Sequence, residues 1–366
     1  MFIVKRDEFV DSWRGLFHVL LLIDHLPVVL LGLSSFVSGF LEPLGYVSVT
    51  EGFVFLSGFV SGIVYTRVSQ SQGDRAMRRK ALGRARDIYL TYVVAAIFLL
   101  LLSRTAPASA FNWEGATGID ALPELMISLK ILFLLYQPSF LEILPMYCLL
   151  LLVTPLLIKQ LEDRNYTLVL SMSVLIWISA QYGIREKLLS LVPERFGMSC
   201  GCFDLFSWQL LFVMGLMCGH KTFVCKRPWI VNCRVFFVLA YGIALLLFFL
   251  RHDLFGFTIH SDNYLVDRSL LGPIRLIDFI CICFLVTRMR LCLAPYINWS
   301  GFAFLSRHSL QVFAFHLYPI YFAALFLKER PSSSPLLQVC LIALCIGSLF
   351  LIAYLARRLT ACRTYT

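Results

Sequence analysis

Residues 331–356 read PSSSPLLQVCLIALCIGSLFLIAYLA, a run of twenty-six residues without a formal charge. A transmembrane α-helix needs about 20 mainly apolar residues to cross the hydrocarbon core of a bilayer. Uncharged runs of similar character occur at Asn165–Ile184, Val235–Leu250 and His308–Leu327. Together these runs predict an all-α protein that crosses the membrane several times.

The composition of the whole chain agrees with this prediction. Its 366 residues are 59% hydrophobic and 15% charged, with a mean hydropathy of +0.79. A chain this apolar cannot fold with a fully wet surface, which excludes a soluble enzyme, a nucleic-acid reader and a secreted disulfide scaffold. The net charge of +10 is explained by cytoplasmic loops rich in Lys and Arg. We therefore expect the lipid bilayer as a partner and no nucleic acid.

Hydropathy, with breaks at Pro, Gly and charged residues, predicts one polytopic membrane helix bundle over residues 1–366, with about ten transmembrane helices. The expected spans are about 12–33, 46–66, 87–103, 140–158, 166–182, 204–220, 235–250, 271–287, 299–326 and 336–356. No connecting loop is long enough for a separate soluble catalytic domain. Any chemistry must therefore take place within the helix bundle.

The run Leu122–Tyr136 is ambiguous because it contains Glu124 and Lys130, so it is either an eleventh span or a helix in the membrane interface. The positive-inside rule distinguishes these alternatives. Ten spans place twenty Lys and Arg residues on the cytoplasmic side and nine outside, whereas eleven spans place sixteen inside and twelve outside. We therefore expect ten spans, an interfacial helix near 122–136, and both termini in the cytoplasm.

The cysteines and the N-terminus give no sign of metal binding or cleavage. Most of the twelve cysteines lie in apolar runs, where cysteine packs as a small hydrophobe. Cys200 and Cys202 lie in a loop, but a single Cys-x-Cys without a second pair or a nearby His is weak evidence for a metal site. We expect no metal and no tightly bound cofactor. Arg14, Asp24 and His25 interrupt the segment that would form the apolar core of a cleavable signal peptide.

The first expected helix carries ionisable residues, although each costs at least about 2.5 kcal/mol at a helix centre. Arg14 and His25 are eleven residues apart, close to three helical turns and ~16 Å along the axis, and His18 shares their face. A coenzyme A thioester has its phosphates and its reactive carbonyl at opposite ends of an arm of comparable length. Arg14 could hold the phosphates at the cytoplasmic side while His25 acts deeper as a general base. Alternatively, Arg14 reaches lipid head groups and His25 hydrogen-bonds a backbone carbonyl.

Glu51, near the start of the second expected helix, is placed at a depth similar to that of His25. A carboxylate on one imidazole nitrogen would fix the tautomer and leave the other nitrogen to accept a proton. Asp24 is a further catalytic candidate, but on a helix it points about 100° away from His25, so we expect Glu51 to be the partner. Ser57 belongs to a run of small residues that either contributes to the site or permits close helix packing.

Three stretches, in this order, resemble the motifs of the acyltransferase-3 superfamily of integral-membrane acyltransferases. They are Arg14-x10-His25, Phe-Val-Phe-Leu-Ser-Gly-Phe at 53–59, and Ser-Leu-Gln-Val-Phe-Ala-Phe-His-Leu-Tyr-Pro at 309–319. Within that superfamily the chain is most similar to OpgC-type proteins. This similarity rests on RDxxVDxxRG at 6–15, IDHLP at 23–27, EGFVFLSG at 51–58, ILPMY at 143–147, WQLLFVMG at 208–215 and RHSLQVF at 307–313.

The resemblance implies a ten-helix enzyme of the bacterial inner (cytoplasmic) membrane. Such an enzyme takes an acyl group from cytoplasmic acyl-CoA, its co-substrate, and transfers it to a hydroxyl of a periplasmic glucan or other glycan. In the OpgC-type branch the acyl group is succinyl, so succinyl transfer is the first expectation and acetyl transfer the second. Arg14 and His25 match the Arg-x10-His motif of the superfamily.

Two further assignments follow from the resemblance. The superfamily has an Arg-x3-Arg pair before the third helix, where this chain has Lys80-x3-Arg84 and Arg86. These three residues are the candidate ligands of the CoA phosphates. His316 would be a second buried histidine, which either faces His25 or forms an ordinary interhelical hydrogen bond.

Two other functions remain open at the level of sequence. In a proton-coupled transporter or permease, His25, Glu51 and His316 would relay protons rather than activate a hydroxyl. A non-enzymatic scaffold of a glycan-synthesis complex would need none of these residues for chemistry. Release of CoA thiol that depends on His25 would distinguish the enzyme from both alternatives.

Overall fold

The structure is a computed structural model, and it falls into two compact units. It describes residues 7–26, 44–105, 124–138, 140–191, 201, 203–226, 234–254, 256, 259, 263–320, 322 and 335–363. The terminal unit comprises Met1–Pro43, Phe98–Gly115 and Arg288–Thr366, and the central unit comprises Leu44–Ile97 and Ala116–Thr287.

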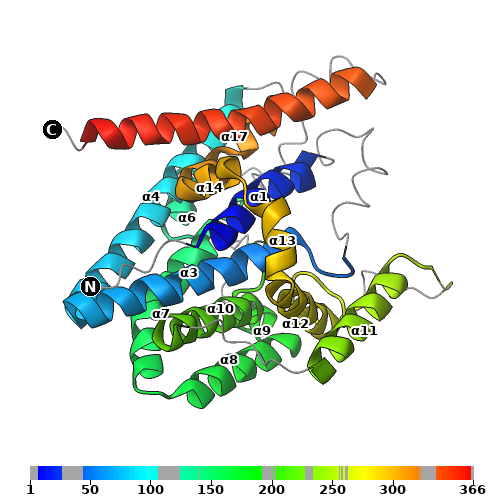
Figure 1. Cartoon of the computed structure of the whole chain (residues 1–366). Coiled ribbons are helices and arrows are strands. Elements are labelled where there is room, and N and C mark those ends of the chain that lie inside the picture. Colours follow the sequence, from blue (N-terminus) through cyan, green and yellow to red (C-terminus); the bar gives the residue numbers. More distant parts are fainter. Residues whose placement is uncertain are drawn as a thin grey trace. The chain divides into compact units, whose positions relative to one another are not determined.

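The all-α prediction is confirmed, since the described part of the chain consists of helices and connecting turns without a strand (Figure 1). The helices are α1 (Glu8–His25), α3 (Val49–Gln72), α4 (Asp74–Thr105), α6 (Glu124–Leu132), α7 (Ile143–Glu162), α8 (Tyr166–Gln181), α9 (Ile184–Leu189), α10 (Leu205–Cys225), α11 (Arg234–Arg251), α12 (Pro273–Arg288), α13 (Arg290–Ile297), α14 (Ser300–Arg307), α15 (Ser309–Phe315) and α17 (Pro335–Arg363).

Five of these helices are long and apolar enough to cross a membrane. They are α3, α4 over Asp74–Leu102, α7, α11, and α17 over Val339–Leu359. Helix α11 shows why a bilayer is needed, because only Ala240 and Leu247 of its eighteen residues are buried within the protein. The described residues thus identify a membrane protein, while the expected number of ten spans remains a prediction. The part of the first expected span beyond residue 26 lies outside the described residues.

Helix α4 begins thirteen residues before the expected start of its span at residue 87. The basic run from Arg75 to Arg86, expected to be a loop, forms its first turns. Gly73 separates α3 from α4 with a φ of +82°, a conformation that glycine adopts without strain. Hydropathy missed this extension because Arg, Lys, Ala and Met have high helix propensity but only the last two are apolar.

Helices α3 and α10 form the core of the central unit, where their backbones touch through glycine (Figure 1). A Cβ atom on Gly58 would lie 2.1 Å from the carbonyl oxygen of Phe212, and one on Gly215 would lie 2.1 Å from that of Phe55. Gly62 and Gly219 make the same kind of approach one turn further on. Residue numbers rise together along this contact, so the two helices are parallel. The expected close packing at the small residues of α3 is therefore confirmed.

Helix α1 packs in the same close way against α14 in the terminal unit. A Cβ atom on Gly15 would lie 1.9 Å from the carbonyl oxygen of Phe302. Helix α17 contacts both α1 and α14, with Trp299 and Phe350 in edge contact at 5.8 Å between ring centroids. Glycine at position 15 thus allows the polar face of α1 to lie directly on the segment that begins with α14.

The expected single span 299–326 is wrong for its described part, which is broken at His308 and again at His316. Along α14 the numbering runs opposite to α1, since Phe302 lies beside Gly15 and Ser306 beside Asp11. Along α15 the numbering runs with α1, since Ser309 contacts Arg14 and His316 contacts His25. No Pro or Gly between residues 302 and 318 signals these breaks, and hydropathy is unchanged by a turn between two apolar segments.

Helix α6, within the ambiguous run 122–136, has nine described helical residues and ends at Leu132. At 1.5 Å per residue it is ~13 Å long, less than half of the roughly 30 Å hydrocarbon core of a bilayer. Leu134 follows in the left-handed conformation, with a φ of +60°. The described part of this helix is therefore too short to cross a bilayer on its own.

Candidate active site

The N-terminus of α1 is held by an ion pair and a helix cap. The side chain of Asp7 accepts hydrogen bonds from the backbone N–H groups of Phe9 and Val10 at 3.1 and 3.4 Å. It also accepts two from the Arg290 guanidinium at 2.8 and 2.6 Å. Because Asp7 satisfies both the helix terminus and the arginine, it fixes the rotation of α1 against α13.

One face of α1 is polar although it is buried. Along this face Ser306 donates to Asp11 at 3.3 Å, and Arg14 donates through Nη2 to the Ser309 hydroxyl at 3.2 Å. His18 is buried on the same face, with Arg14 and His316 as electrostatic neighbours. The expected common face of Arg14, His18 and His25 is therefore present, and it packs against the broken segment that contains α14 and α15.

At the end of this face His25 meets His316. Nδ1 of His25 lies 3.0 Å from Nε2 of His316, and the rings are stacked with centroids 5.2 Å apart and an interplanar angle of 29°. The two residues are 7% and 2% exposed. Nδ1 of His316 forms a further hydrogen bond with the backbone carbonyl of Phe313. Of the two alternatives for His316, the structure thus has the one in which it faces His25, through a hydrogen bond between the two rings.

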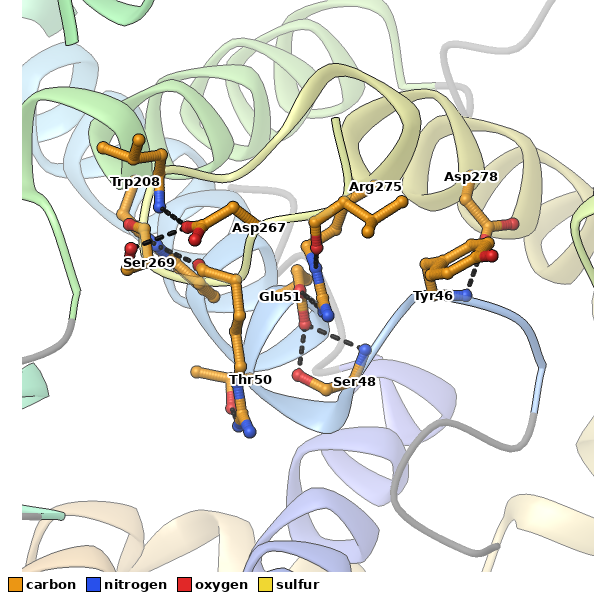
Figure 2. Close-up of polar contacts among 12 residues, drawn as sticks. Tyr46, Ser48, Thr50, Glu51, Trp208, Asp267, Ser269, Arg275 and Asp278 are labelled. Carbon is orange, nitrogen blue, oxygen red and sulfur yellow. Dashed lines mark hydrogen bonds and ion pairs between the residues drawn. The ribbon is translucent and has the colours of Figure 1, made fainter. Parts of the chain in front are cut away.

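The hydrogen bonds that the structure describes for Glu51 lie in the central unit. It accepts from Arg275 Nη1 at 2.6 Å, from the Ser48 N–H at 3.0 Å and from the Ser48 hydroxyl (Figure 2). The ion pair is almost fully enclosed, with side-chain exposures of 0% for Glu51 and 4% for Arg275. A contact between Glu51 and His25 would join the two units and stays a prediction.

Further polar contacts surround this ion pair. Tyr46 donates its backbone N–H to Asp278 at 2.7 Å, Arg268 donates to Thr50 at 3.0 Å, and Arg275 Nε donates to the Val266 carbonyl at 3.2 Å (Figure 2). The first two bonds connect the segment before and at the start of α3 with residues 263–278, and the third lies within that segment. The cluster fixes where α3 begins, which makes it an anchor of the central unit.

Sequence reasoning missed Arg275, Asp278 and Ser309. Arg275 lies within the expected span 271–287, and its partner is 224 positions away in the chain. A local signal was nevertheless present for Glu51: Ser48-x-x-Glu51 before an apolar run is the pattern of a capping box, and the structure contains that box. This pattern predicts a helix start at which the Glu51 carboxylate already accepts a hydrogen bond from the N-cap residue.

The remaining candidates lie on the exposed surface of α4 or beside the α3–α10 contact. Lys80, Arg84 and Arg86 are exposed on the first half of α4, where Arg86 pairs with Asp87 at 3.3 Å. Lys80 and Arg84 share one face of the helix, since four residues span about 400°, whereas Arg86 lies elsewhere on the surface. Ser57 is half-buried beside the α3–α10 contact.

Asp24, Cys200 and Cys202 are the other residues that the sequence singled out. Asp24 is half-buried, one position from His25 on α1. Cys200 and Cys202 lie outside the described residues.

The apolar helices and the buried, hydrogen-bonded histidine pair define an integral-membrane protein with a polar site between its helices. The chain belongs to the OpgC family: the family model described as OpgC protein matches residues 6–361, nearly the whole chain. Comparison with curated proteins and with solved structures gives no match.

Proposed function

We propose that the protein is a membrane O-acyltransferase that moves a succinyl group from acyl-CoA to a hydroxyl of a glucan or other glycan. Membership of the OpgC family supports the glucan-modifying succinyltransferase class. The observation that carries the proposal is the His25–His316 pair on the same face of α1 as Arg14. At one end of this face His25 can serve as the base at the thioester, and at the other end Arg14 can bind the CoA phosphates. Acetyl-CoA is the alternative donor.

The reaction needs one proton acceptor and no metal. His25 accepts the proton of the acceptor hydroxyl, and the hydroxyl oxygen attacks the thioester carbonyl. The C–S bond then breaks, and the CoA thiolate takes the proton from His25, which leaves an O-acyl ester and free CoA. Arg14 and the basic residues Lys80, Arg84 and Arg86 are proposed to bind the CoA phosphates. Attack by His25 itself, through an acyl-histidine, would give the same products in two steps.

We propose that the chain has ten spans in a bacterial inner membrane, with both termini in the cytoplasm. The parallel packing of α3 and α10 supports this topology. Three helices, α4, α7 and α8, come between them in the sequence, and three crossings leave α10 running in the same direction as α3. An additional crossing at 122–136 would make α3 and α10 antiparallel. A reporter fused after Arg164 should read cytoplasmic and one fused after Arg195 periplasmic, and the reverse pattern would overturn the topology.

The proposed activity is tested with purified protein, succinyl-CoA and a glucan acceptor. Wild-type protein should release CoA thiol at a rate that depends on the acceptor, and His25→Ala should lower turnover by about 10²–10⁴-fold, as expected for loss of a general base. His220→Ala is the matched control, since His220 is equally buried but lies in the central unit, hydrogen-bonded to Tyr166 at 3.0 Å. It should keep its turnover per folded molecule.

Other outcomes would identify another function. Movement of the donor or the glycan across liposomes without thiol release would indicate a transporter. Thiol release that is equal in wild-type and folded His25→Ala protein would remove His25 from the chemistry. Mass spectrometry of the glucan product identifies the acyl group transferred, because succinyl and acetyl differ in mass and charge.

A further inference from the structure

The hydrogen bond of His316 to a backbone carbonyl determines where its proton lies. A carbonyl oxygen only accepts hydrogen bonds, so Nδ1 of His316 must carry the hydrogen that points to Phe313. This carbonyl is available because Phe313 lies in the last turn of α15, where carbonyl groups lack the N–H partners of a continuing helix. The break of the helix at His316 thus creates the acceptor.

A neutral imidazole has one N–H group, so a hydrogen on Nδ1 leaves Nε2 of His316 as an acceptor. An imidazolium at this position would have to keep its charge in a site that is 2% exposed, which is costly without a counter-ion. With His316 neutral, the 3.0 Å contact requires Nδ1 of His25 to be the donor. The hydrogen of His25 therefore also lies on Nδ1.

We propose that His316 is a positioning residue that holds His25 in its Nδ1–H tautomer, so that Nε2 of His25 is the atom that accepts the proton. The inference rests on the proposed acyl transfer and names the atom at which that reaction takes its proton. The sequence of bonds runs from His25 Nδ1–H to His316 Nε2, and from His316 Nδ1–H to the Phe313 carbonyl. A neutral imidazole and a carbonyl thus occupy the place that a carboxylate takes beside many catalytic histidines.

This arrangement also explains how the site tolerates the reaction. When Nε2 of His25 takes the proton of the hydroxyl, the ring becomes an imidazolium, and its Nδ1–H bond to His316 becomes charge-assisted and stronger. The oriented dipoles of the His316 ring and the Phe313 carbonyl therefore help to stabilise the positive charge. In the resting state both rings are neutral, which keeps the cost of burying them low.

The first test reads the tautomer itself. Nitrogen-15 spectra of the full-length protein labelled at histidine distinguish a protonated ring nitrogen from an unprotonated one, and the chain has only seven histidines. The His25 signals are identified as those lost in His25→Ala. We expect Nδ1 of His25 to be protonated and Nε2 unprotonated in the wild-type protein. The opposite tautomer would overturn the proposal without any substitution at His316.

The second test compares two substitutions of similar size. His316→Gln keeps an oxygen that can accept from Nδ1–H of His25, whereas His316→Leu removes the acceptor. His316→Leu should release His25 towards the Nε2–H tautomer and lower kcat by about 10- to 100-fold, because only the competent fraction of molecules then reacts. The KM for acyl-CoA should not change, and His316→Gln should recover most of the turnover.

The results separate this inference from the proposed function. If His316→Leu leaves both the tautomer and kcat unchanged, His316 does not position His25. If wild-type protein releases no thiol but its His25 carries the hydrogen on Nδ1, the tautomer assignment holds and the acyltransferase proposal fails. If His316→Leu does not fold, as judged by its thermal midpoint in detergent, the wild-type spectrum still decides the tautomer.

Discussion

Two buried polar pairs, one in each unit, differ in the kind of bond that holds them. In the terminal unit two neutral rings, His25 and His316, share one hydrogen bond of 3.0 Å. In the central unit Glu51 and Arg275 form an ion pair at 2.6 Å, and Ser48 supplies two more donors to the carboxylate. A neutral pair can take up a proton that its shared hydrogen bond helps to stabilise, whereas an ion pair with all its donors in place resists any change of charge. The first pair is therefore suited to proton transfer, and the second to holding the start of α3 in place.

The largest effect is expected from breaking the ion pair on one side. Arg275→Leu leaves the Glu51 carboxylate buried without its main partner, so the free energy of unfolding should fall by about 3–5 kcal/mol. Denaturation of the purified protein in detergent measures the change. The double variant Glu51→Leu with Arg275→Leu should be more stable than Arg275→Leu alone, and equal or lower stability would show that the pair does not act as a unit.

A smaller loss is expected for Glu51→Gln, which keeps the shape and one accepting oxygen. The stability should fall by about 1.5–3 kcal/mol, because hydrogen bonds to a charged group become bonds to a neutral one. Turnover per folded molecule should stay close to that of the wild type. A large loss of kcat without a loss of stability would instead make Glu51 a partner in the chemistry of His25, as the sequence suggested.

The contact between α3 and α10 should be sensitive to a single methyl group. Gly58→Ala would place a carbon 2.1 Å from the Phe212 carbonyl oxygen, so the helices must move apart at a cost of about 1–3 kcal/mol. Gly83→Ala is the matched control, because a Cβ atom at Gly83 has no neighbour within 4 Å. Equal stability of the two variants in a detergent unfolding experiment would mean that α3 and α10 do not touch at Gly58.

The smallest effect is expected at Arg14, where a phosphate ligand holds substrate and transition state alike. Arg14→Ala should raise the KM for acyl-CoA by about tenfold, equivalent to about 1.4 kcal/mol, with little change in kcat. Steady-state kinetics with varied acyl-CoA give both constants. A collapsed kcat with an unchanged KM would indicate that Arg14 supports the α1–α15 contact through Ser309 rather than the substrate.

Local patterns predicted several features well because their physical causes are local. The uncharged runs predicted the all-α membrane class, since a span must be apolar over its whole length. The spacing of Arg14, His18 and His25 predicted their common face, since a helix repeats every 3.6 residues. The small residues of α3 predicted close packing for the same reason, although they did not identify α10 as the neighbour.

The partners of the buried polar groups depended on the tertiary structure. Arg275 lies 224 positions from Glu51, and His316 lies 291 positions from His25, so no periodicity connects them. The breaks at His308 and His316 have no Pro or Gly to announce them, yet they present Ser309 to Arg14 and the Phe313 carbonyl to His316. The amino-acid sequence by itself determined which residues are apolar, helical and ionisable, because these are properties of a side chain and its near neighbours. Which ionisable groups form a locked ion pair and which form a neutral pair was decided only when distant segments packed together.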